Sequence, residues 1–476
     1  MPGWMPSIRY LKAWWWLEPD PTPVLSTLTK LRAGQLTGTR RLTLACGLTA
    51  FPPEIFDLAD SLEILDLSGN ALNSLPDDLP RLHKLRILFC SDNQFTELPV
   101  VLGQCPALVM VGFKANQIRT VPGAALPVAL RWLILTDNQI EQLPPELGRC
   151  TQVQKLMLAG NRLQALPPEM AACTRLELLR LAANCLTELP SFLLTLPRLS
   201  WLAYAGNPFC EPAEMAALDR APISLIDWNT LTLQHTLGEG ASGVIHQAQH
   251  QRDEVVQAVA VKLFKGAVTS DGLPRCEMMA CISAGAHANL IPVLGQVQGH
   301  PAGVQGMVMA LIDPRFGNLA GPPSLDSCTR DVYLDATAFD LTSVITLALG
   351  IASAARHLHA QGLMHGDLYA HNILHAGQGR TLLGDFGAAS FFVSDQWPIA
   401  QALQRLEVRA FGCLLEELLA RCHGAPDSHA ALQALSALQI ACMREVTSAR
   451  PLFTEVELVL TELAQREKLA NVSHRQ

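Results

Sequence analysis

The sequence predicts a multidomain protein in which an α/β solenoid of short repeats precedes an α+β domain. Two observations support this order. Asparagines recur at intervals of 22 or 23 residues from Asn70 to Asn207, a period that is typical of stacked repeats. From Trp228 onward this period ends, and an apolar strand pattern followed by a glycine-rich turn begins a segment with motifs of its own.

The composition argues against several classes of protein. The net charge of -8 is mild and no run of Lys and Arg occurs, so nucleic acid is not an expected partner. The thirteen cysteines include no C-x-x-C pair, which indicates neither a disulfide framework nor a zinc site and favours a reducing, cytoplasmic compartment. Because no uncharged apolar run reaches about 18 residues, we expect no membrane span.

The tryptophan-rich residues 1–24 form an N-terminal extension with two interpretations. They are either a segment that caps the repeats or the product of a start codon placed too early, and we favour the second. The apolar run from Ala13 to Leu17 is shorter than the apolar region of a signal peptide, which has about 7–15 residues. The repeats themselves are expected over residues 25–210.

The phrase LEILDLSGNALNSLP recurs with variations, for example as LRILFCSDNQFTELP and LRWLILTDNQIEQLP. It resembles the leucine-rich repeat pattern L-x-x-L-x-L-x-x-N/C-x-L, whose period is about 20–29 residues. The resemblance implies about eight turns of a horseshoe-shaped solenoid, with Cys46 at the asparagine position of the first. Leucines are expected to fill a shared core together with Cys105, Cys150 and Cys173, while each asparagine bonds the backbone of an adjacent loop.

The outward positions of the predicted strands are unusually apolar. Because side chains alternate along a strand, the residues six and four positions before each Asn are expected to share one concave face. A contiguous apolar surface usually marks an interaction site. We therefore predict a protein partner or substrate on this face or, alternatively, coverage by the second domain of the same chain. The residues concerned are Ile64, Ile87, Phe89, Met110, Trp132, Ile134, Met157, Leu178 and Trp201.

Residues 211–228 are predicted to form a capping helix and linker, after which phosphate-binding motifs begin. The order is a G-x-G-x-x-G-x-V turn, a VAVK strand, a helical pattern with a glutamate, an HGDL loop followed by Asn, and GDFG. Together these motifs resemble the protein kinase family over residues 229–465, which leaves 466–476 as a polar tail. The resemblance implies a bilobal domain, and the whole chain is similar to bacterial leucine-rich-repeat kinases.

The resemblance also implies a role for each motif residue. Lys262, fixed by an ion pair to Glu277, would hold the α- and β-phosphates of ATP, and Asp367 would orient the acceptor hydroxyl and accept its proton. Asn372 and Asp385 would hold Mg²⁺. In the implied nucleotide site Met309 is the gatekeeper, and Ala310 to Ile312 form the hinge beside adenine. The implied nucleotide contacts are Gly238, Glu239, Gly240, Ala241, Ser242, Gly243, Val244, Ala260, Lys262, Met309, Ala310, Leu311 and Ile312.

The loop MHGDLYAHNIL departs from the family pattern in two places. Gly366 replaces the arginine before the catalytic aspartate, which makes this a non-RD kinase and predicts independence from activation-loop phosphorylation. Tyr369 replaces the phosphate-binding lysine of serine/threonine kinases, so His371 is predicted to supply positive charge to the transferred phosphoryl group. With an unperturbed pKa near 6.5, that charge, and activity with it, would fall between about pH 6 and 8.

The segment that follows also departs from the pattern. Glu407 replaces the usual aspartate of the next helix, only 22 residues after Asp385, and no A-P-E sequence lies between them. Arg450, which resembles the late arginine of the family, is therefore expected to lack its usual glutamate partner. The platform for a peptide substrate is expected to be reduced.

Three functions compete on these grounds. The leading hypothesis is an active protein kinase, with serine/threonine favoured over tyrosine specificity, steered by its repeats. The first alternative is a pseudokinase scaffold. Against it stands the presence of all five residues with implied roles in phosphate or metal binding and proton transfer, namely Lys262, Glu277, Asp367, Asn372 and Asp385. The second is a small-molecule phosphotransferase, because HGDL followed by Asn is also similar to the aminoglycoside phosphotransferase loop.

Overall fold

The computed structural model describes residues 24–220, 224–240, 242–266, 269, 271–393, 397–423 and 429–473. Among these residues the chain separates into two compact units, one that ends at Phe209 and one that begins at Cys210. The first 23 residues of the predicted N-terminal extension lie outside the described residues, as do Ala241 of the glycine-rich turn and the last three residues of the predicted tail.

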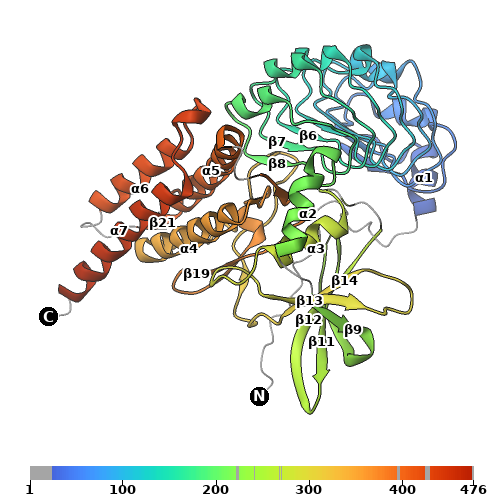
Figure 1. The fold of residues 1–476 in the computed structure, drawn as a ribbon. Helices are drawn as coiled ribbons and strands as arrows, with labels where there is room; N and C mark the ends of the chain where they lie inside the picture. Colours follow the sequence, from blue (N-terminus) through green and yellow to red (C-terminus); the bar gives the residue numbers. More distant parts are fainter. Residues whose placement is uncertain are drawn as a thin grey trace, which may run out of the picture. The chain divides into compact units, whose positions relative to one another are not determined.

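The first unit is a solenoid whose eight strands form one parallel sheet in sequence order (Figure 1). Pairing in register stacks equivalent positions of successive repeats, as in Met110, Trp132 and Lys155. This arrangement confirms the predicted fold class of the N-terminal region. Helix α1 (Val24–Arg32) precedes the strands, which are β1 (Arg41–Thr43), β2 (Ile64–Asp66), β3 (Ile87–Phe89), β4 (Met110–Gly112), β5 (Trp132–Ile134), β6 (Lys155–Met157), β7 (Leu178–Arg180) and β8 (Trp201–Ala203).

A short 3-10 helix follows each strand, between that strand and the next one in the sequence. Most of them begin directly after a proline, whose ring fixes φ near the value that such a turn needs; Pro99 and Pro144, for example, have φ of -62° and -74°. The helices are η1 (Pro53–Leu58), η2 (Leu79–Arg81), η3 (Val100–Gln104), η4 (Gly123–Ala125), η5 (Pro145–Arg149), η6 (Pro168–Ala172), η7 (Ser191–Thr195) and η8 (Pro208–Cys210).

The repeat asparagines bridge successive turns. Asn138 accepts a hydrogen bond from the amide of Ile118 at 3.0 Å, and its Nδ2 donates to the carbonyl oxygens of Phe113 at 2.9 Å and Leu135 at 3.0 Å. Asn161 repeats this pattern one turn later. Each asparagine thus satisfies main-chain groups of its own turn and of the preceding one, which would otherwise be buried without partners.

The residue before each repeat asparagine adopts a left-handed backbone conformation. Its φ lies between 52° and 72° in all seven repeats. Glycine tolerates this region, whereas an L side chain there costs about 1–2 kcal/mol. The tight turn that aims the asparagine inward therefore carries strain wherever glycine is absent. The residues are Gly69, Asp92, Ala115, Asp137, Gly160, Ala183 and Gly206.

The concave face is more buried than the sequence led us to expect. Trp132 and Trp201 are 4% and 1% exposed, and Lys155 Nζ lies 4.1 Å from the centroid of the Trp132 ring. Partial exposure remains on β2 and β3, at Ile64 and Phe89. The other predicted positions are also buried, namely Ile87, Met110, Ile134, Met157 and Leu178. Among the described residues, the apolar face is accessible only toward its N-terminal end.

All thirteen cysteines lie among the described residues, and none of them forms a disulfide. Cys105, Cys150 and Cys173 are buried in the repeat core, as predicted. Burial raises the pKa of each of these three thiols to about 11. They are therefore uncharged core fillers at neutral pH.

The second unit begins with α2 (Glu211–Arg220) and a six-stranded sheet (Figure 1). Strand β9 (Leu225–Asp227) lies in the predicted linker but pairs with β13 in parallel at the sheet edge. Because the linker ends as a strand, it is part of the sheet. In spatial order from the opposite edge, the strands are β10 (Leu231–Glu239), β11 (Gly243–Arg252), β12 (Val255–Phe264), β14 (Gly306–Ala310) and β13 (Val293–Gln298), and helix α3 spans Pro274–Ser283.

The remainder of the unit is mainly helical. Helix α4 (Leu341–Ala360) is the one described helix that is long and apolar enough to cross a membrane, but 61% of its apolar window is buried, as in the core helix of a folded domain. Smaller elements are η9 (Trp228–Thr230), β15 (Gly317–Asn318), β16 (Phe339–Asp340), β17 (Leu363–Met364), η10 (Ala370–Asn372), β18 (Ile373–Ala376), β19 (Arg380–Leu383), β20 (Ser390–Phe391), β21 (Cys422–His423) and η12 (Thr447–Ala449).

Three further helices complete the unit: α5 (Trp397–Leu419), α6 (His429–Cys442) and α7 (Phe453–Ser473). Helix α5 begins ten residues before Glu407, so the second part of the segment expected between Asp385 and that residue is helical. Helix α7 continues into the predicted polar tail. Arg450 is buried, and its guanidinium donates to the carbonyl oxygens of Arg444 at 2.8 Å and Arg405 at 3.2 Å. These hydrogen-bond acceptors belong to the main chain.

We predict that Asn138→Ala lowers the free energy of unfolding of the repeat unit by about 1–3 kcal/mol. The change leaves the buried amide of Ile118 without its acceptor, whereas the carbonyl oxygens of Phe113 and Leu135 each keep a hydrogen bond from the asparagine of a neighbouring repeat. Urea denaturation measures the loss, with the exposed Gln164→Ala as the control. Equal stability of the two variants would show that the asparagine bonds are not required.

A second prediction concerns the left-handed turns. Ala183→Gly relieves a side chain at φ 55° and should stabilise the repeat unit by about 0.5–1 kcal/mol, after allowance for the greater chain entropy of glycine. Ala124→Gly, in η4, should destabilise by a similar amount because no such strain exists there. The thermal midpoints of the two variants should therefore move in opposite directions.

Candidate active site

The glycine-rich turn joins β10 to β11 at one end of the sheet. The amide of Gly240 donates to the carbonyl oxygen of Gly243 at 2.9 Å, which closes the turn. A Cβ atom at Gly243 would overlap the carbonyl oxygen of Leu263 on β12, whereas one at Gly240 would meet nothing within 4 Å. Gly243 is therefore needed for close strand packing, and Gly240 leaves open backbone of the kind that receives phosphates.

A buried ion pair lies behind this turn. Lys262 on β12 pairs with Glu277 on α3, and their side chains are 8% and 2% exposed. Burial by itself lowers the pKa of Lys262, but the charges of Glu277 and Asp385 and the hydrogen bond to Glu277 raise it above its ordinary value. Lys262 is thus a fixed cation.

Asp385 brings a second carboxylate to the pair. It has φ 55°, and its Oδ1 accepts from the amide of Gly387 at 3.2 Å. A Cβ atom at Gly387 would lie 3.2 Å from that Oδ1 and 3.7 Å from Oε2 of Glu277, so both carboxylates border the same glycine. Burial and the charge of Asp385 raise the pKa of Glu277 against the opposing effect of Lys262. Two carboxylates around one ammonium leave an excess of negative charge that suits a cation.

The predicted Mg²⁺ ligands fit that ion. Magnesium is usually held by one or two carboxylates together with substrate phosphates, and the described residues contain no preformed cluster of three or more His, Cys, Asp or Glu side chains for a metal. Asp385 supplies a carboxylate beside the ion pair. Asn372 supplies an amide whose Nδ2 donates to Oδ2 of Asp367 at 2.8 Å, which turns the amide nitrogen toward that aspartate.

The loop MHGDLYAHNIL, residues 364–374, is the predicted catalytic loop and is called the catalytic loop below. It is held by a buried histidine. His365 is fully buried, and its Nδ1 accepts from the amide of Asp367 at 3.3 Å. Its Nε2 therefore carries the proton and donates to the carbonyl oxygen of Gly384 at 2.9 Å. The loop and the Asp385 segment are thus joined by an imidazole with a bracing role. Asn372 Nδ2 also donates to the main-chain oxygen of Asp367 at 2.9 Å.

Gly366 and Glu407 form a second anchor that the sequence did not predict. Gly366 has φ 73°, a conformation that suits glycine. Its amide donates to Oε1 of Glu407 at 2.7 Å, and Oε2 of the same side chain lies 2.7 Å from Nε2 of His359 on α4. Burial would raise the pKa of Glu407, but the hydrogen bond and charge of His359 lower it. A buried carboxylate on α5 thus fixes the loop backbone.

His371 differs from the expectation of an ordinary imidazole. Its Nδ1 lies 2.7 Å from Oδ1 of Asp331, and its amide donates to Oδ2 at 3.0 Å. Burial lowers the pKa of His371, but Asp331, with Asp367 and Asp385, raises it above the usual value. The protonated form therefore persists to higher pH than an unperturbed imidazole allows, and the expected loss of charge between about pH 6 and 8 moves upward.

The predicted hinge begins at the end of β14, which contains Met309 and Ala310. Ala260 on β12 pairs in register with Met309, and both are buried. Ala310 ends the strand and its amide donates to the carbonyl oxygen of Pro292 at 2.9 Å, while Leu311 and Ile312 follow as partly exposed backbone. Glu239, at the end of β10, pairs with Lys265 at the surface. Val244 lies opposite Leu263 in the sheet.

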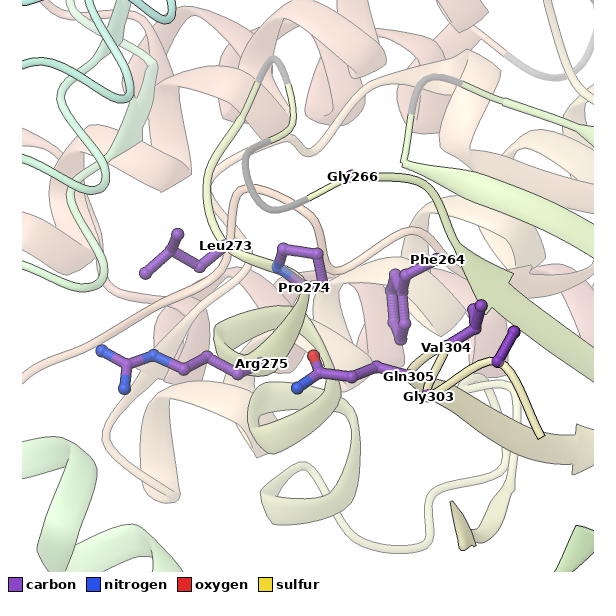
Figure 2. Close-up of a pocket in the computed structure, with 9 residues that line it drawn as sticks. Phe264, Gly266, Leu273, Pro274, Arg275, Gly303, Val304 and Gln305 are labelled. Atoms are coloured by element: carbon purple, nitrogen blue, oxygen red, sulfur yellow. The ribbon is translucent and has the colours of Figure 1, made fainter. Parts of the chain in front are cut away.

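One cavity of this unit lies outside the glycine-rich turn and the predicted hinge. It measures about 450 Å³ and is lined by Phe264, the first turn of α3 and the loop before β14 (Figure 2). Lys262 Nζ lies 5.4 Å from the centroid of the Phe264 ring. The cavity therefore adjoins the ion pair through Phe264. None of the residues that line it is a predicted nucleotide contact.

Comparison with known proteins agrees with this geometry. Residues 231–409 match the family described as protein tyrosine and serine/threonine kinase, and residues 61–82 match the leucine-rich repeat. Tyrosine-protein kinase hopscotch of Drosophila melanogaster is 30% identical over 150 residues, which cover 30% of this chain and 12% of that protein.

Two further relatives differ in the amino acid that their names give as acceptor. The megakaryocyte-associated tyrosine-protein kinase of Mus musculus is 28% identical over 208 residues, 41% of this chain and 37% of that protein. The serine/threonine-protein kinase mos of Gallus gallus is 26% identical over 175 residues, 34% of this chain and 48% of that protein. The chain thus spans less than half the length of each of these relatives.

We predict that Glu407→Leu lowers the free energy of unfolding of the second unit by about 2–6 kcal/mol. The substitution leaves the Gly366 amide and His359 buried without their acceptor, at about 1–3 kcal/mol for each. The exposed Glu445→Leu should change stability by less than about 0.5 kcal/mol. Chemical denaturation of both variants measures the difference, and similar midpoints would refute the anchoring role.

Proposed function

We propose that this chain, which joins leucine-rich-type repeats to a protein kinase domain, is an active ATP-dependent protein kinase. The observation that carries the proposal is the assembly of both halves of a phosphoryl-transfer site. The buried Lys262–Glu277 pair is formed, and Asp367 is hydrogen-bonded to Asn372. Activity requires these groups in place at the same time.

ATP with Mg²⁺, when bound, supplies the phosphoryl group and neutralises the charge that develops on it. Lys262 holds the phosphates as a cation that Glu277 keeps in one position. Asp367 orients the acceptor hydroxyl and accepts its proton, and Asn372 and Asp385 hold the metal. His371 adds a positive charge near Asp367, which its bond to Asp331 favours.

We propose serine or threonine as the acceptor residue. Position 371 lacks the arginine that tyrosine kinases carry there, and its histidine is bound by Asp331. Gly366 and the short stretch between Asp385 and α5 support independence from activation-loop phosphorylation. Phosphoamino-acid analysis of the products, before and after phosphatase treatment of the enzyme, tests both points.

The repeats are proposed to bind a protein partner or substrate. The partly exposed Ile64 and Phe89, on the N-terminal strands, support this role. Coverage of the face by the second domain remains the alternative. The absence of disulfides among thirteen cysteines supports a cytoplasmic location.

A pseudokinase scaffold and a small-molecule phosphotransferase are the competing proposals. Incubation with labelled ATP, Mg²⁺ and a generic protein, in parallel with an aminoglycoside, separates the three. Label in protein supports the kinase, label in the small molecule supports the phosphotransferase, and nucleotide binding without transfer supports the scaffold.

We predict that Lys262→Met and Asp385→Asn each reduce phosphoryl transfer to protein by at least about 100-fold. Both residues act on the nucleotide phosphates or their metal, so the thermal midpoint should change little for Asp385→Asn. Lys262→Met leaves Glu277 buried without its cation and should also lower the midpoint.

Lys265→Met serves as the control, because it removes a lysine just after β12 that lies outside the buried pair. This variant should keep activity within a few fold of the parent. Transfer by Lys262→Met or Asp385→Asn at the rate of the parent enzyme would sink the assignment.

A further inference from the structure

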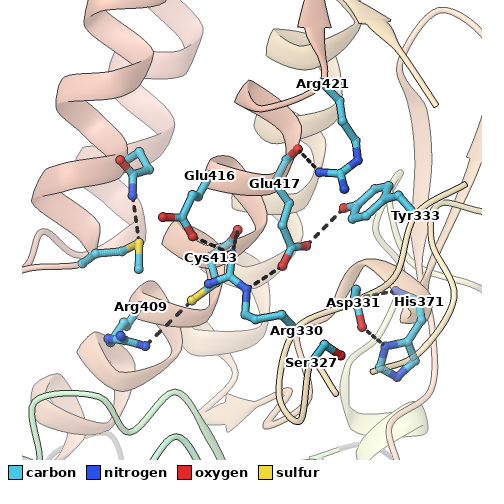
Figure 3. Close-up of polar contacts among 12 residues, drawn as sticks. Ser327, Arg330, Asp331, Tyr333, His371, Arg409, Cys413, Glu416, Glu417 and Arg421 are labelled. Carbon is cyan, nitrogen blue, oxygen red and sulfur yellow. Dashed lines mark hydrogen bonds and ion pairs between the residues drawn. The ribbon is translucent and has the colours of Figure 1, made fainter. Parts of the chain in front are cut away.

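The segment Ser324–Tyr333, between the hinge and α4, is tied to the end of α5 by charged side chains, and we call it the tether. Arg330 Nε lies 2.8 Å from Oε1 of Glu417, and its second amino nitrogen lies 2.6 Å from Oε2 of Glu416 (Figure 3). The same nitrogen donates to the carbonyl oxygen of Cys413 at 3.0 Å. Arg330 thus joins the tether to α5 at three points.

A second contact fixes the far end of the tether. The hydroxyl of Tyr333 donates to Oε2 of Glu417 at 3.2 Å, and the guanidinium carbon of Arg421 lies 3.9 Å from the centroid of the Tyr333 ring. Arg421 also donates to the main-chain oxygen of Glu417 at 2.9 Å. Because Arg330 and Tyr333 share the Glu417 carboxylate, the residues between them are held on both sides (Figure 3).

Asp331 lies between these two anchors and faces the catalytic loop. It is 8% exposed, and its two carboxylate oxygens bind the amide and Nδ1 of His371. Asn318, which precedes the tether in β15, also contacts this loop, because its Nδ2 donates to the carbonyl oxygen of His371 at 2.8 Å. The main chain of His371 is therefore bonded on its amide and carbonyl sides by residues outside the loop.

The position of His371 bears directly on the metal ligands. Asn372 is the next residue, and its Nδ2 makes both of its hydrogen bonds to Asp367. A shift of the His371 peptide would therefore move the amide of Asn372 relative to the carboxylates of Asp367 and Asp385. Outer residues that orient metal ligands commonly change metal affinity or activity by about 10–100-fold when they are replaced.

We propose that Asp331 is a positioning residue that sets Asn372 for metal binding and that Arg330 keeps it in place through α5. This inference rests on the proposed function, because it concerns the metal step of phosphoryl transfer. It adds a contact that reaches the catalytic loop from 40 residues earlier in the sequence.

The test compares Asp331→Ala, Asp331→Asn and the control Asp335→Asn, an exposed aspartate just beyond the tether. The first measurement is amide hydrogen exchange of the loop around His371 in nucleotide-free protein. Exchange should be at least about tenfold faster in Asp331→Ala than in the control, because the amide loses its acceptor. Asp331→Asn should be intermediate, since its amide oxygen still accepts from the main chain.

The second measurement is the affinity for a fluorescent ADP analogue with and without Mg²⁺. Without metal the variants should agree within about twofold, whereas the gain in affinity on adding Mg²⁺ should fall about tenfold in Asp331→Ala. The third is kinetic: kcat should fall by a similar factor at unchanged KM for the protein acceptor, with partial rescue in Asp331→Asn.

These measurements separate the two proposals. If the parent enzyme transferred no phosphate to protein, the proposed function would fail. Amide hydrogen exchange and the Mg²⁺-dependent affinity for the ADP analogue would still test the role of Asp331. Exchange and metal-dependent affinity in Asp331→Ala equal to those of Asp335→Asn would overturn the positioning role. A variant that loses affinity equally with and without Mg²⁺ would also overturn it, because that result indicates a general loss of structure.

Discussion

The need to satisfy main-chain amides in tight, buried turns is the constraint on which both units depend. In the repeats, Asn138 accepts from the amide of Ile118 in the previous turn. In the second unit, Glu407 accepts from Gly366 and Asp331 accepts from His371. In each case a polar side chain from elsewhere holds backbone that no helix or sheet ladder can pair. The catalytic loop is therefore held by the same physical means as a repeat turn.

The charge balance around the ion pair follows from a different constraint. Lys262 and Glu277 are both nearly excluded from solvent, and each would be costly to bury alone. Asp385 adds a second negative charge beside them and has a left-handed backbone conformation. The two carboxylates and one ammonium therefore leave an excess of negative charge, which favours a cation at this position.

Much of this was predictable because it depends on local spacing. The period of the asparagines predicted the solenoid, and the order of the motifs predicted the ion pair between Lys262 and Glu277. The left-handed residue before each asparagine could have been found from the recurring Gly, Asp or Ala there. The Asp331–His371 contact could not, because it joins segments 40 residues apart and no local pattern marks it. Burial of Trp132 was likewise inaccessible, since it depends on contacts that strand alternation does not specify.

The asparagine bridges have a consequence for how the repeat array can change in length. Every bridge spans about one period, from an asparagine to backbone 20 residues earlier in the case of Asn138 and 21 in the case of Asn161. Duplication of one whole repeat would therefore supply both the new donor and the new acceptor groups, whereas insertion of a partial repeat would leave a turn without its bridge. Genes of this kind can lengthen by copying entire modules, and the size of the repeat sheet can evolve without alteration of the second unit.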